Sequence, residues 1–276
     1  MRQAICHYSF HRRYKAEGWD ADRLAAEVKA LGVEGVDFHT SLLGDPDAAP
    51  GAIKAALARH GLVLSGLSMG NDFNKSDPAE FRSQVNDVKR WLQVAAEVET
   101  PVSRIFGGDL KKDRHEDTDA AAAGRRRILD GIGEVVKEAE RLGVVFALEN
   151  HGGLPCTAEE QVEVIETINS PNLKATVDIG NYMQGGQESA VAVAIAMKHC
   201  AYVHFKDFAK APDASYPWGY KIVPAVIGEG DVDIPACVKI MRDNGYAGFV
   251  ALEYEADEDE RTAVPRSLAY MKKVLG

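Results

Sequence analysis

The chain has 276 residues, 46% of them hydrophobic and 27% charged, so most of it can fold around a large apolar core. Its longest apolar runs fall far short of the roughly 20 residues that span a bilayer, which excludes a transmembrane helix. The formal net charge of −10 disfavours nucleic acid as a partner, because such binding depends on neutralising phosphates. The four cysteines form no CxxC pair, which is typical of a reduced cytoplasmic protein. The amino-terminus turns polar too early for a signal peptide, and we expect the mature chain to start at or near Met1.

Short β-rich apolar runs alternate with longer amphipathic stretches along the whole sequence. We predict eight strands, at residues 3–6, 35–39, 62–68, 101–106, 144–149, 173–178, 202–205 and 249–253. Helical patterns lie between them, at residues 21–31, 80–98, 119–142, 158–168, 187–199, 235–244 and 260–274. Repeated βα alternation without a change in composition favours one α/β domain over residues 1–276, a single (β/α)8 TIM barrel, over a doubly wound sheet.

The longest connection between predicted elements covers residues 206–233 and is rich in proline, glycine and aromatic residues. Loops of this length within a compact domain are usually functional, so we predict a lid over the mouth of the barrel. A surface excursion without a function is the alternative. The large aromatic side chains of this segment argue against that alternative, because they would be permanently exposed to water.

Barrel enzymes carry their active sites at the C-terminal ends of the strands, and four consecutive predicted strands end in a residue with useful chemistry. These residues are Glu149, Asp178, His204 and Glu253. Because side chains alternate faces along a strand, all four share the inward face with small or branched residues. Taken singly, each carboxylate could be a solvated strand end or a helix cap, and the histidine a core residue. Together they predict one divalent metal, Mn²⁺ first, with Mg²⁺, Zn²⁺ or Co²⁺ as alternatives.

The segments that carry these residues contain further motifs. They read Glu149-Asn150-His151-Gly152-Gly153, Asp178-Ile179-Gly180-Asn181, His204-Phe205-Lys206-Asp207 and Gly228-Glu229-Gly230-Asp231-Val232-Asp233, and Glu253 closes the series. These segments resemble the xylose isomerase-like barrels, which include sugar isomerases and epimerases, inosose dehydratase, hydroxypyruvate isomerase and an abasic-site endonuclease. The resemblance covers essentially the whole chain. It implies one divalent metal held by Glu149, Asp178, His204 and Glu253, and it implies that the two glutamates also move protons.

The chemistry of such a site agrees with that implication. A metal bound to a ketone and its neighbouring hydroxyl stabilises an enediolate, while a carboxylate on each face removes and returns a proton. Glu149 and Glu253 are therefore the candidate catalytic residues. Lys206 lies two residues after His204 and faces the same way, so it could stabilise an oxyanion or hold an anionic group. Pairing of this lysine with Asp207 is the alternative.

Five further residues are candidates for substrate contact. His39 lies on the inward face of the second predicted strand, and Asn71 closes the third in a loop that resembles one common in the superfamily. Arg104, near the end of the fourth strand, could bind a phosphate or carboxylate or form a structural ion pair. His151 could orient a ligand or cap a helix. Asn181 stands where the ketohexose 3-epimerases of the superfamily carry a histidine.

These features predict a metal-dependent isomerase or epimerase of a small sugar, keto acid or sugar acid, acting through an enediolate. The oligomeric state is open, and a dimer or tetramer would be compatible with the sequence. The closest alternative is a lyase of the same fold, either an inosose or 3-oxo-sugar dehydratase or a 3-oxo-sugar-acid decarboxylase. The same enolate can eliminate water or arise by loss of CO₂, so the sequence does not separate these reactions. Asn181 and Lys210 replace a histidine and an arginine of the ketohexose epimerases, which argues against a free ketohexose as substrate.

Two other classes fit less well. Abasic-site endonucleases of this superfamily bind three metals through extra histidines on the third and fourth strands and after the aspartate. This chain has Met69-Gly70-Asn71, Phe106-Gly107-Gly108 and Asn181 at those places, so that activity is a remote alternative. A sugar-binding barrel without catalysis is the other, and metal binding without turnover would favour it.

Overall fold

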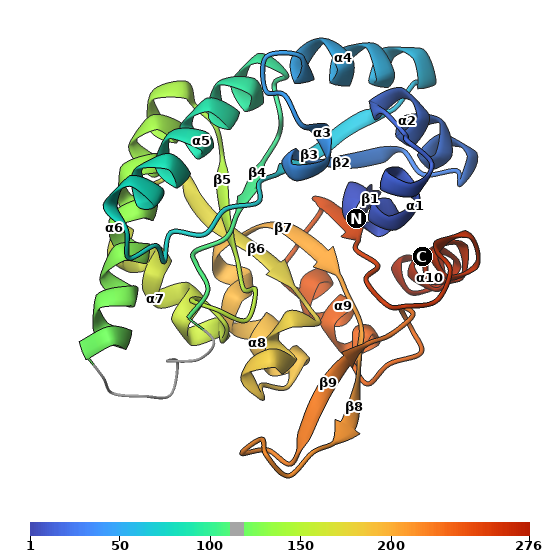
Figure 1. The fold of residues 1–276 in the computed structure, drawn as a ribbon. Coiled ribbons are helices and arrows are strands. Elements are labelled where there is room, and N and C mark those ends of the chain that lie inside the picture. The colour runs from blue at the N-terminus through green and yellow to red at the C-terminus, as the bar shows by residue number, and fades with distance from the viewer. Residues whose placement is uncertain (111–118) are drawn as a thin grey trace.

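Eight parallel strands close into a barrel in the computed structural model, which describes residues 1–110 and 119–276 (Figure 1). Around the barrel the order is β1-β10-β7-β6-β5-β4-β3-β2. The strands are β1 (Arg2–Cys6), β2 (Gly35–His39), β3 (Val63–Ser68), β4 (Ser103–Ile105), β5 (Phe146–Glu149), β6 (Leu173–Asp178), β7 (Cys200–Phe205) and β10 (Phe249–Leu252). The predicted (β/α)8 barrel is confirmed, and each predicted strand overlaps an observed one.

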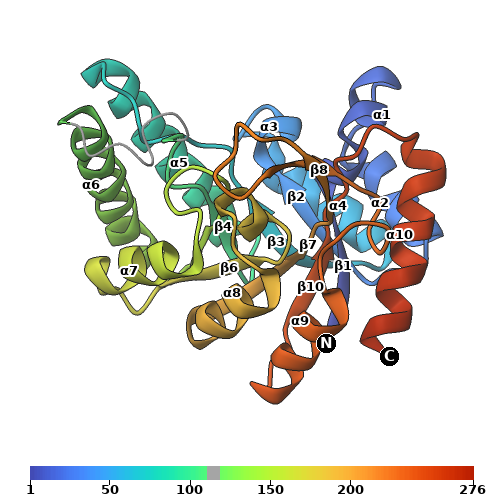
Figure 2. The same cartoon turned by 90° about the horizontal axis from the view of Figure 1, so that it is seen from below.

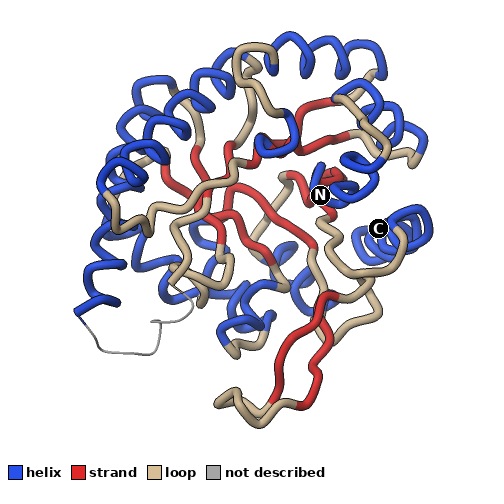
Figure 3. The backbone as a smooth tube through the Cα atoms, viewed as in Figure 1, coloured by secondary structure: helices blue, strands red, loops and turns tan. Residues whose placement is uncertain are grey.

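Helices form an outer ring around the strands (Figure 3). They are α1 (His11–Ala16), α2 (Ala21–Ala30), α3 (Thr40–Leu43), α4 (Ala49–His60), α5 (Pro78–Glu97), α6 (Asp119–Leu142), α7 (Ala158–Ile168), α8 (Ser189–Ala196), α9 (Ile234–Asp243) and α10 (Glu260–Leu275), with short 3₁₀ helices η1 (His7–Phe10), η2 (Asn181–Gly185) and η3 (Met197–His199). The bounds predicted for α6 and α7 are those observed, whereas α4 was not predicted. No helix in the described ranges is long and apolar enough to cross a membrane.

The apolar core has an outer and an inner part. The outer part fills the space between the strands and the helices. The inner part, here called the inner plug, fills the barrel itself and consists of Ala4, Val102, Ala147, Tyr202, Phe249 and Ala251. Three of its members are alanines, which leave room for the two aromatic rings. Because inward-facing residues recur at every second position, the strands that supply the plug also supply the layer above it.

The long connection predicted at residues 206–233 is not a loop throughout. It contains an antiparallel hairpin of β8 (Phe208–Pro212) and β9 (Tyr220–Pro224), which extends outward from the barrel (Figure 1). Pro212 and Pro224 are each the last residue of a strand of this hairpin, where a missing N–H is tolerated, and Pro217 lies between the two strands. Figure 2 shows the hairpin at the same end of the barrel as α3, with both termini at the opposite end. Its action as a lid stays a prediction.

The root of the hairpin is fixed by Asp207, which follows β7. Its carboxylate accepts hydrogen bonds from the backbone N–H groups of Gly228, Gly230 and Val232, at 2.8 to 3.2 Å. The chain that returns from the hairpin is therefore held against the end of β7. This use of the carboxylate explains why Asp207 does not pair with Lys206.

A close contact between the loop after β3 and helix α6 shapes one side of the barrel mouth. Phe73 is fully buried, and its N–H donates to the carbonyl of Gly107 at 3.0 Å. Its ring lies so close to α6 that a Cβ added at Gly131 would come within 2.5 Å of the ring. Only glycine fits at this position of the helix without a shift of the ring.

We therefore predict opposite effects of alanine at two glycines of α6. Alanine is favoured over glycine in helices by about 1 kcal/mol, but overpacking a core costs about 1–3 kcal/mol. Gly131→Ala should lower the free energy of unfolding by about 1–2 kcal/mol, measured as the urea midpoint with unchanged slope. The matched control Gly133→Ala would meet only the tip of Ile168, at 3.5 Å, and should be neutral or stabilising. Equal midpoints for the two variants would contradict the close packing.

Candidate metal centre at the barrel mouth

The four predicted metal ligands come together directly above the inner plug. Glu149, Asp178 and His204 lie on β5, β6 and β7, and Glu253 follows β10. All four are buried, and each offers one ligand atom that lies within 4.8 Å of the other three. Three oxygens and one nitrogen in this arrangement could hold a metal ion of the Mn²⁺, Mg²⁺ or Zn²⁺ type.

The hydrogen bonding of these residues agrees with a cation between them. Within the described residues, the buried atoms Glu149 Oε2, Asp178 Oδ2, His204 Nδ1 and Glu253 Oε2 make no hydrogen bond of regular geometry. Buried polar atoms normally have such a partner, and exceptions mark sites for an ion or a water molecule. The exceptions among the described residues include one atom on each member of the predicted set. The residues therefore fit a divalent metal.

Asp37 on β2 fixes the orientation of the His204 ring. Its Oδ2 lies 3.1 Å from Nε2 of His204 and accepts a second bond from the Ser68 hydroxyl at 2.7 Å. A carboxylate can only accept, so Nε2 carries the proton and Nδ1 faces the other candidate ligands. Burial lowers the pKa of His204, but Glu253 and Asp37 outweigh burial and raise it to about 10. Sequence analysis did not assign a role to Asp37.

Glu149 is held on both of its oxygens. The Asn181 amide donates to Oε1 at 3.0 Å, and Nε of Arg104 lies 2.9 Å from Oε2. The guanidinium is itself anchored, because it donates to the carbonyl of Met69 at 3.0 Å and lies 4.0 Å from the centre of the Phe106 ring. Burial raises the pKa of Glu149 to about 8 despite the opposing effect of Arg104. The structure shows the ion pair that was one of the two roles left open for Arg104, and its contact with a substrate stays a prediction.

Glu253 is held from two sides by different partners. Nζ of Lys206 lies 2.8 Å from its Oε2, and the Cys6 thiol donates to its Oε1 at 3.6 Å. Burial alone would raise the pKa of Glu253, but Lys206 and His204 hold it well below the ordinary value. Lys206 thus faces the site as the strand alternation predicted. Its predicted catalytic role stays a prediction.

Asp178 is positioned by the chain around it. Its Oδ1 accepts the backbone N–H groups of Gly180 and Asn181, at 2.9 and 3.0 Å. The Asn150 side chain binds both the N–H and the carbonyl of Asp178, at 3.1 and 3.0 Å. Only Oδ2 is left to face the other candidate ligands. Burial raises the pKa of Asp178, and Lys206 opposes that shift.

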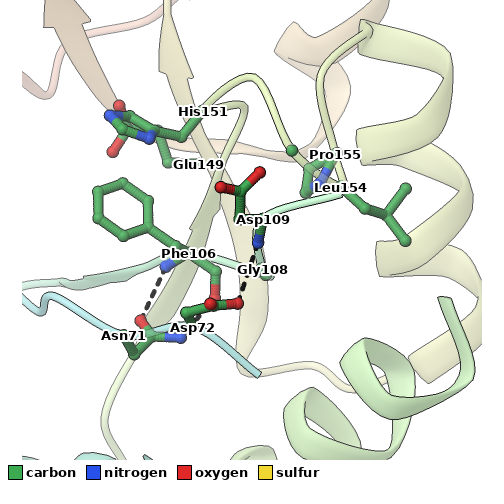
Figure 4. Close-up of a pocket in the computed structure, with 11 residues that line it drawn as sticks. Asn71, Asp72, Phe106, Gly108, Asp109, Glu149, His151, Leu154 and Pro155 are labelled. Carbon is green, nitrogen blue, oxygen red and sulfur yellow. Dashed lines mark hydrogen bonds between the residues drawn. The ribbon is translucent and has the colours of Figure 1, made fainter. Parts of the chain in front are cut away.

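A cavity of about 260 Å³ lies beside Glu149 (Figure 4). Loops after β3, β4 and β5 line it, with Asn71, Asp72, Phe106, Gly107, Gly108, Asp109, Glu149, His151, Gly153, Leu154 and Pro155. Two predicted substrate-binding residues, Asn71 and His151, belong to this lining. Asn71 binds both the N–H and the carbonyl of Phe106, at 3.0 and 2.7 Å, so it also ties two loops together. The His151 ring lies 4.2 Å from the Phe106 ring, centre to centre.

His39 and Asn181, the other predicted substrate contacts, are buried beside the ligand set. Nδ1 of His39 accepts the N–H of Ser41 at 3.3 Å, and its ring lies 5.5 Å from that of Tyr8. Burial lowers the pKa of His39 well below its ordinary value. Asn181 reaches the site through its bond to Glu149. Substrate contact by these two residues stays a prediction.

The structure adds residues to the site that the sequence analysis did not assign. Asp37 orients His204, Cys6 contacts Glu253, and Glu255 lies 3.2 Å from Nζ of Lys206. The two-residue period offered a signal for Asp37 and Cys6, because both lie on inward-facing positions near a strand end. Glu255 belongs to an acidic stretch after the last strand, where no periodicity indicates direction.

Asp37→Asn tests the orientation of His204. The amide would favour the ring tautomer that carries its proton on Nδ1, the nitrogen that faces the candidate ligands. We expect Mn²⁺ affinity to fall about 10- to 100-fold, the usual effect of losing such a partner, in calorimetric titrations. Ser68→Ala, which removes a bond to the same carboxylate but leaves its charge, should have a smaller effect. Unchanged affinity in the asparagine variant would contradict this role.

The chain is 26% identical over 189 residues to the L-ribulose-5-phosphate 3-epimerase UlaE of Escherichia coli K12. The matched residues cover 67% of this chain and 61% of that relative. It superposes on 3-keto-D-glucoside 4-epimerase from E. coli with a TM-score of 0.77, 18% identity and 99% of both chains covered. A xylose isomerase-like protein from Mycobacterium smegmatis in complex with magnesium gives a TM-score of 0.72 at 17% identity, covering 92% of this chain and 87% of that one.

A family model also matches the sequence, over residues 25–274. That match takes in every strand of the barrel except β1, together with all four candidate metal ligands. The protein belongs to the xylose isomerase-like TIM barrel family.

Proposed function

We propose that this protein is a metal-dependent isomerase or epimerase of a small sugar, keto acid or sugar acid. One observation carries the proposal, namely the convergence of two glutamates, an aspartate and a histidine within 4.8 Å above an apolar plug. The similarity to a curated sugar-phosphate epimerase supports it. So does the cavity beside Glu149, whose volume of about 260 Å³ suits a small molecule.

The chemistry divides between the metal and the side chains. A divalent metal, when bound, polarises a substrate carbonyl and its neighbouring hydroxyl and so stabilises an enediolate. Glu149 and Glu253 enter the ligand set from β5 and from the end of β10, two strands that are not neighbours in the barrel. Each carboxylate can take a proton from the carbon next to the carbonyl or return one, at Oε2.

The surroundings of the two glutamates differ, and the difference suits two roles. Glu149 is clamped between Asn181 and the anchored Arg104, so its position is fixed. Glu253 has an ammonium, Lys206, on its Oε2 and only a weak thiol donor on its Oε1. We infer that Glu253 is the carboxylate that moves the proton, because its side chain is less fixed than that of Glu149. Glu149 mainly holds the metal and the substrate in position.

The lining of the cavity suits a polyhydroxylated substrate. Asn71, Asp72, Asp109 and His151 bring polar groups to its walls, and Phe106 supplies an aromatic ring. Such a mixture of a few polar groups with an apolar surface is usual in small-molecule sites. A lyase of the same fold would use the same ligand set, so the mass of the product separates the alternatives. Isomerisation conserves mass, whereas dehydration or decarboxylation does not.

Metal content is the first test. Protein purified without chelator should contain close to one equivalent of a divalent metal per chain by elemental analysis, because the four ligands form one cluster. Removing the metal with a chelator should abolish turnover, and adding Mn²⁺ should restore it. Two or three equivalents held by protein ligands would contradict the single site.

Glu253→Gln separates metal binding from proton transfer. Glutamine keeps the size and one ligating oxygen but does not accept a proton near neutral pH. The variant should keep most of its metal, lose about 10²-fold or more in turnover and lose exchange of the substrate α-proton with D₂O. A screen of small ketoses, keto acids and inososes by mass spectrometry and NMR would identify the substrate for these measurements.

The control for this variant is Asp257→Asn, a charge-neutralising change at an exposed position of the same loop. It should behave like the unmodified protein in all three measurements. Normal solvent exchange in a metal-loaded Glu253→Gln variant would show that Glu253 is only a ligand. The proton would then have to pass through Glu149 or Lys206.

A further inference from the structure

Lys206 is buried at the metal centre with three carboxylates around its ammonium. Its side chain is 1% exposed, and Nζ lies 2.8 Å from Glu253 Oε2, 3.5 Å from Asp178 Oδ2 and 3.2 Å from Glu255 Oε1. Despite these distances, Nζ makes no hydrogen bond of regular geometry with the described residues. The lysine is thus held by charge rather than by directed bonds.

Two of those oxygens are the same atoms that a metal would use. Glu253 Oε2 and Asp178 Oδ2 are among the four buried atoms without a regular hydrogen bond, and both belong to the candidate ligand set. An ammonium and a divalent cation compete for these oxygens, because like charges repel strongly where water is excluded. Binding of the metal should therefore weaken the attraction between these oxygens and the lysine.

We propose that Lys206 is a place-holder cation, which neutralises Asp178 and Glu253 in the metal-free protein and is displaced toward Glu255 when the metal binds. The proposal rests on the metal centre of the proposed function, but it concerns the metal-free state and the exchange of one cation for the other. Glu255 is the natural receiver, because its carboxylate already touches Nζ and its side chain is 24% exposed at the mouth.

Arg104 and Lys206, the two buried cations with long side chains at the site, differ in their freedom to make this exchange. Arg104 is fixed by its hydrogen bond to the Met69 carbonyl and by the Phe106 ring, and it faces Glu149. Lys206 has a flexible four-carbon stem and a compact charge that can reach a new partner by rotation. Arg104 therefore stays in both states, and Lys206 moves.

The exchange has a consequence for folding. Buried carboxylates without a cation would make the protein depend on its metal for stability. With Lys206 in place, the metal-free protein has a counter-charge for the same oxygens. It should therefore fold without metal, at the cost of a lower metal affinity.

Lys206→Met tests the proposal by calorimetric titration with Mn²⁺. Removing the competing charge should tighten Mn²⁺ binding at least tenfold relative to the unmodified protein. Lys206→Arg, which keeps the charge, should bind Mn²⁺ no more tightly than the unmodified protein. Unchanged or weaker binding by the methionine variant would overturn the proposal, because a lysine that only orients the ligands would give that result.

Thermal unfolding without metal supplies an independent measurement. Metal-free Lys206→Met should unfold at a lower temperature than the metal-free unmodified protein. Mn²⁺ should raise the unfolding temperature of the variant by more than it raises that of the unmodified protein. A methionine variant that folds only when Mn²⁺ is present would support the proposal in its strongest form. An equal shift with Mn²⁺ in both proteins would overturn it.

Glu255→Gln keeps the proposal testable if the methionine variant does not fold at all. Loss of the receiving carboxylate should weaken Mn²⁺ binding, whereas the control Asp257→Asn, an equal change of charge on the same loop, should not. Where Lys206→Met folds, adding Glu255→Gln to it should have a smaller effect than in the unmodified protein. Equal effects of the two acidic variants would overturn the displacement toward Glu255.

These outcomes are distinguishable from those that test the enzyme activity. Tighter Mn²⁺ binding in Lys206→Met would stand even if no sugar were turned over. If Lys206→Met does not change the affinity for Mn²⁺, but the Mn²⁺-loaded protein turns over a sugar, the proposed function would stand. The place-holder role of Lys206 would then be overturned. Absence of Mn²⁺ binding by both proteins would overturn the place-holder and the metal centre together.

Discussion

Four carboxylates are buried at one level of the barrel above the inner plug, those of Asp37, Glu149, Asp178 and Glu253. Burying charges of one sign costs free energy unless opposite charges are buried with them. The polar groups around these carboxylates compensate for the cost of burying them. Arg104, Lys206 and His204 bring positive charge or donors, while the backbone after β6 donates to Asp178 and an amide donates to Glu149. Among the buried atoms of the described residues that lack a hydrogen bond of regular geometry is one atom on each of the four candidate ligands, whose ligand atoms lie close together.

The two-residue period of the strands explains why the convergence of the four candidate ligands could be predicted from the sequence. An inward position is fixed once its strand is recognised, so the acid or histidine at each strand end had only one direction to face. The partners of these residues were not accessible in the same way. Cys6 and Glu253 are 247 positions apart in the chain and meet only because the barrel closes through β1 and β10. The hairpin after β7 was not predicted, because the residues of its two short strands are mostly exposed or only partly buried and so lack the apolar run of a barrel strand.

The site is built in two layers that depend on different parts of the sequence. Strand ends supply the candidate ligands, and the loops after β3, β4 and β5 supply the cavity. The loops are cross-linked by Asn71 and packed against α6 through Phe73, so their shape depends on contacts far from the strands. The motifs shared with the family lie mainly in the ligand layer. For this reason the resemblance gave a specific set of candidate ligands but only a broad class of substrate.

The inner plug also decides how molecules reach the centre. Because Tyr202, Phe249 and their small neighbours fill the barrel below the ligands, traffic is confined to the opposite end. A metal ion and a small molecule would therefore have to reach the candidate ligands from the same end of the barrel.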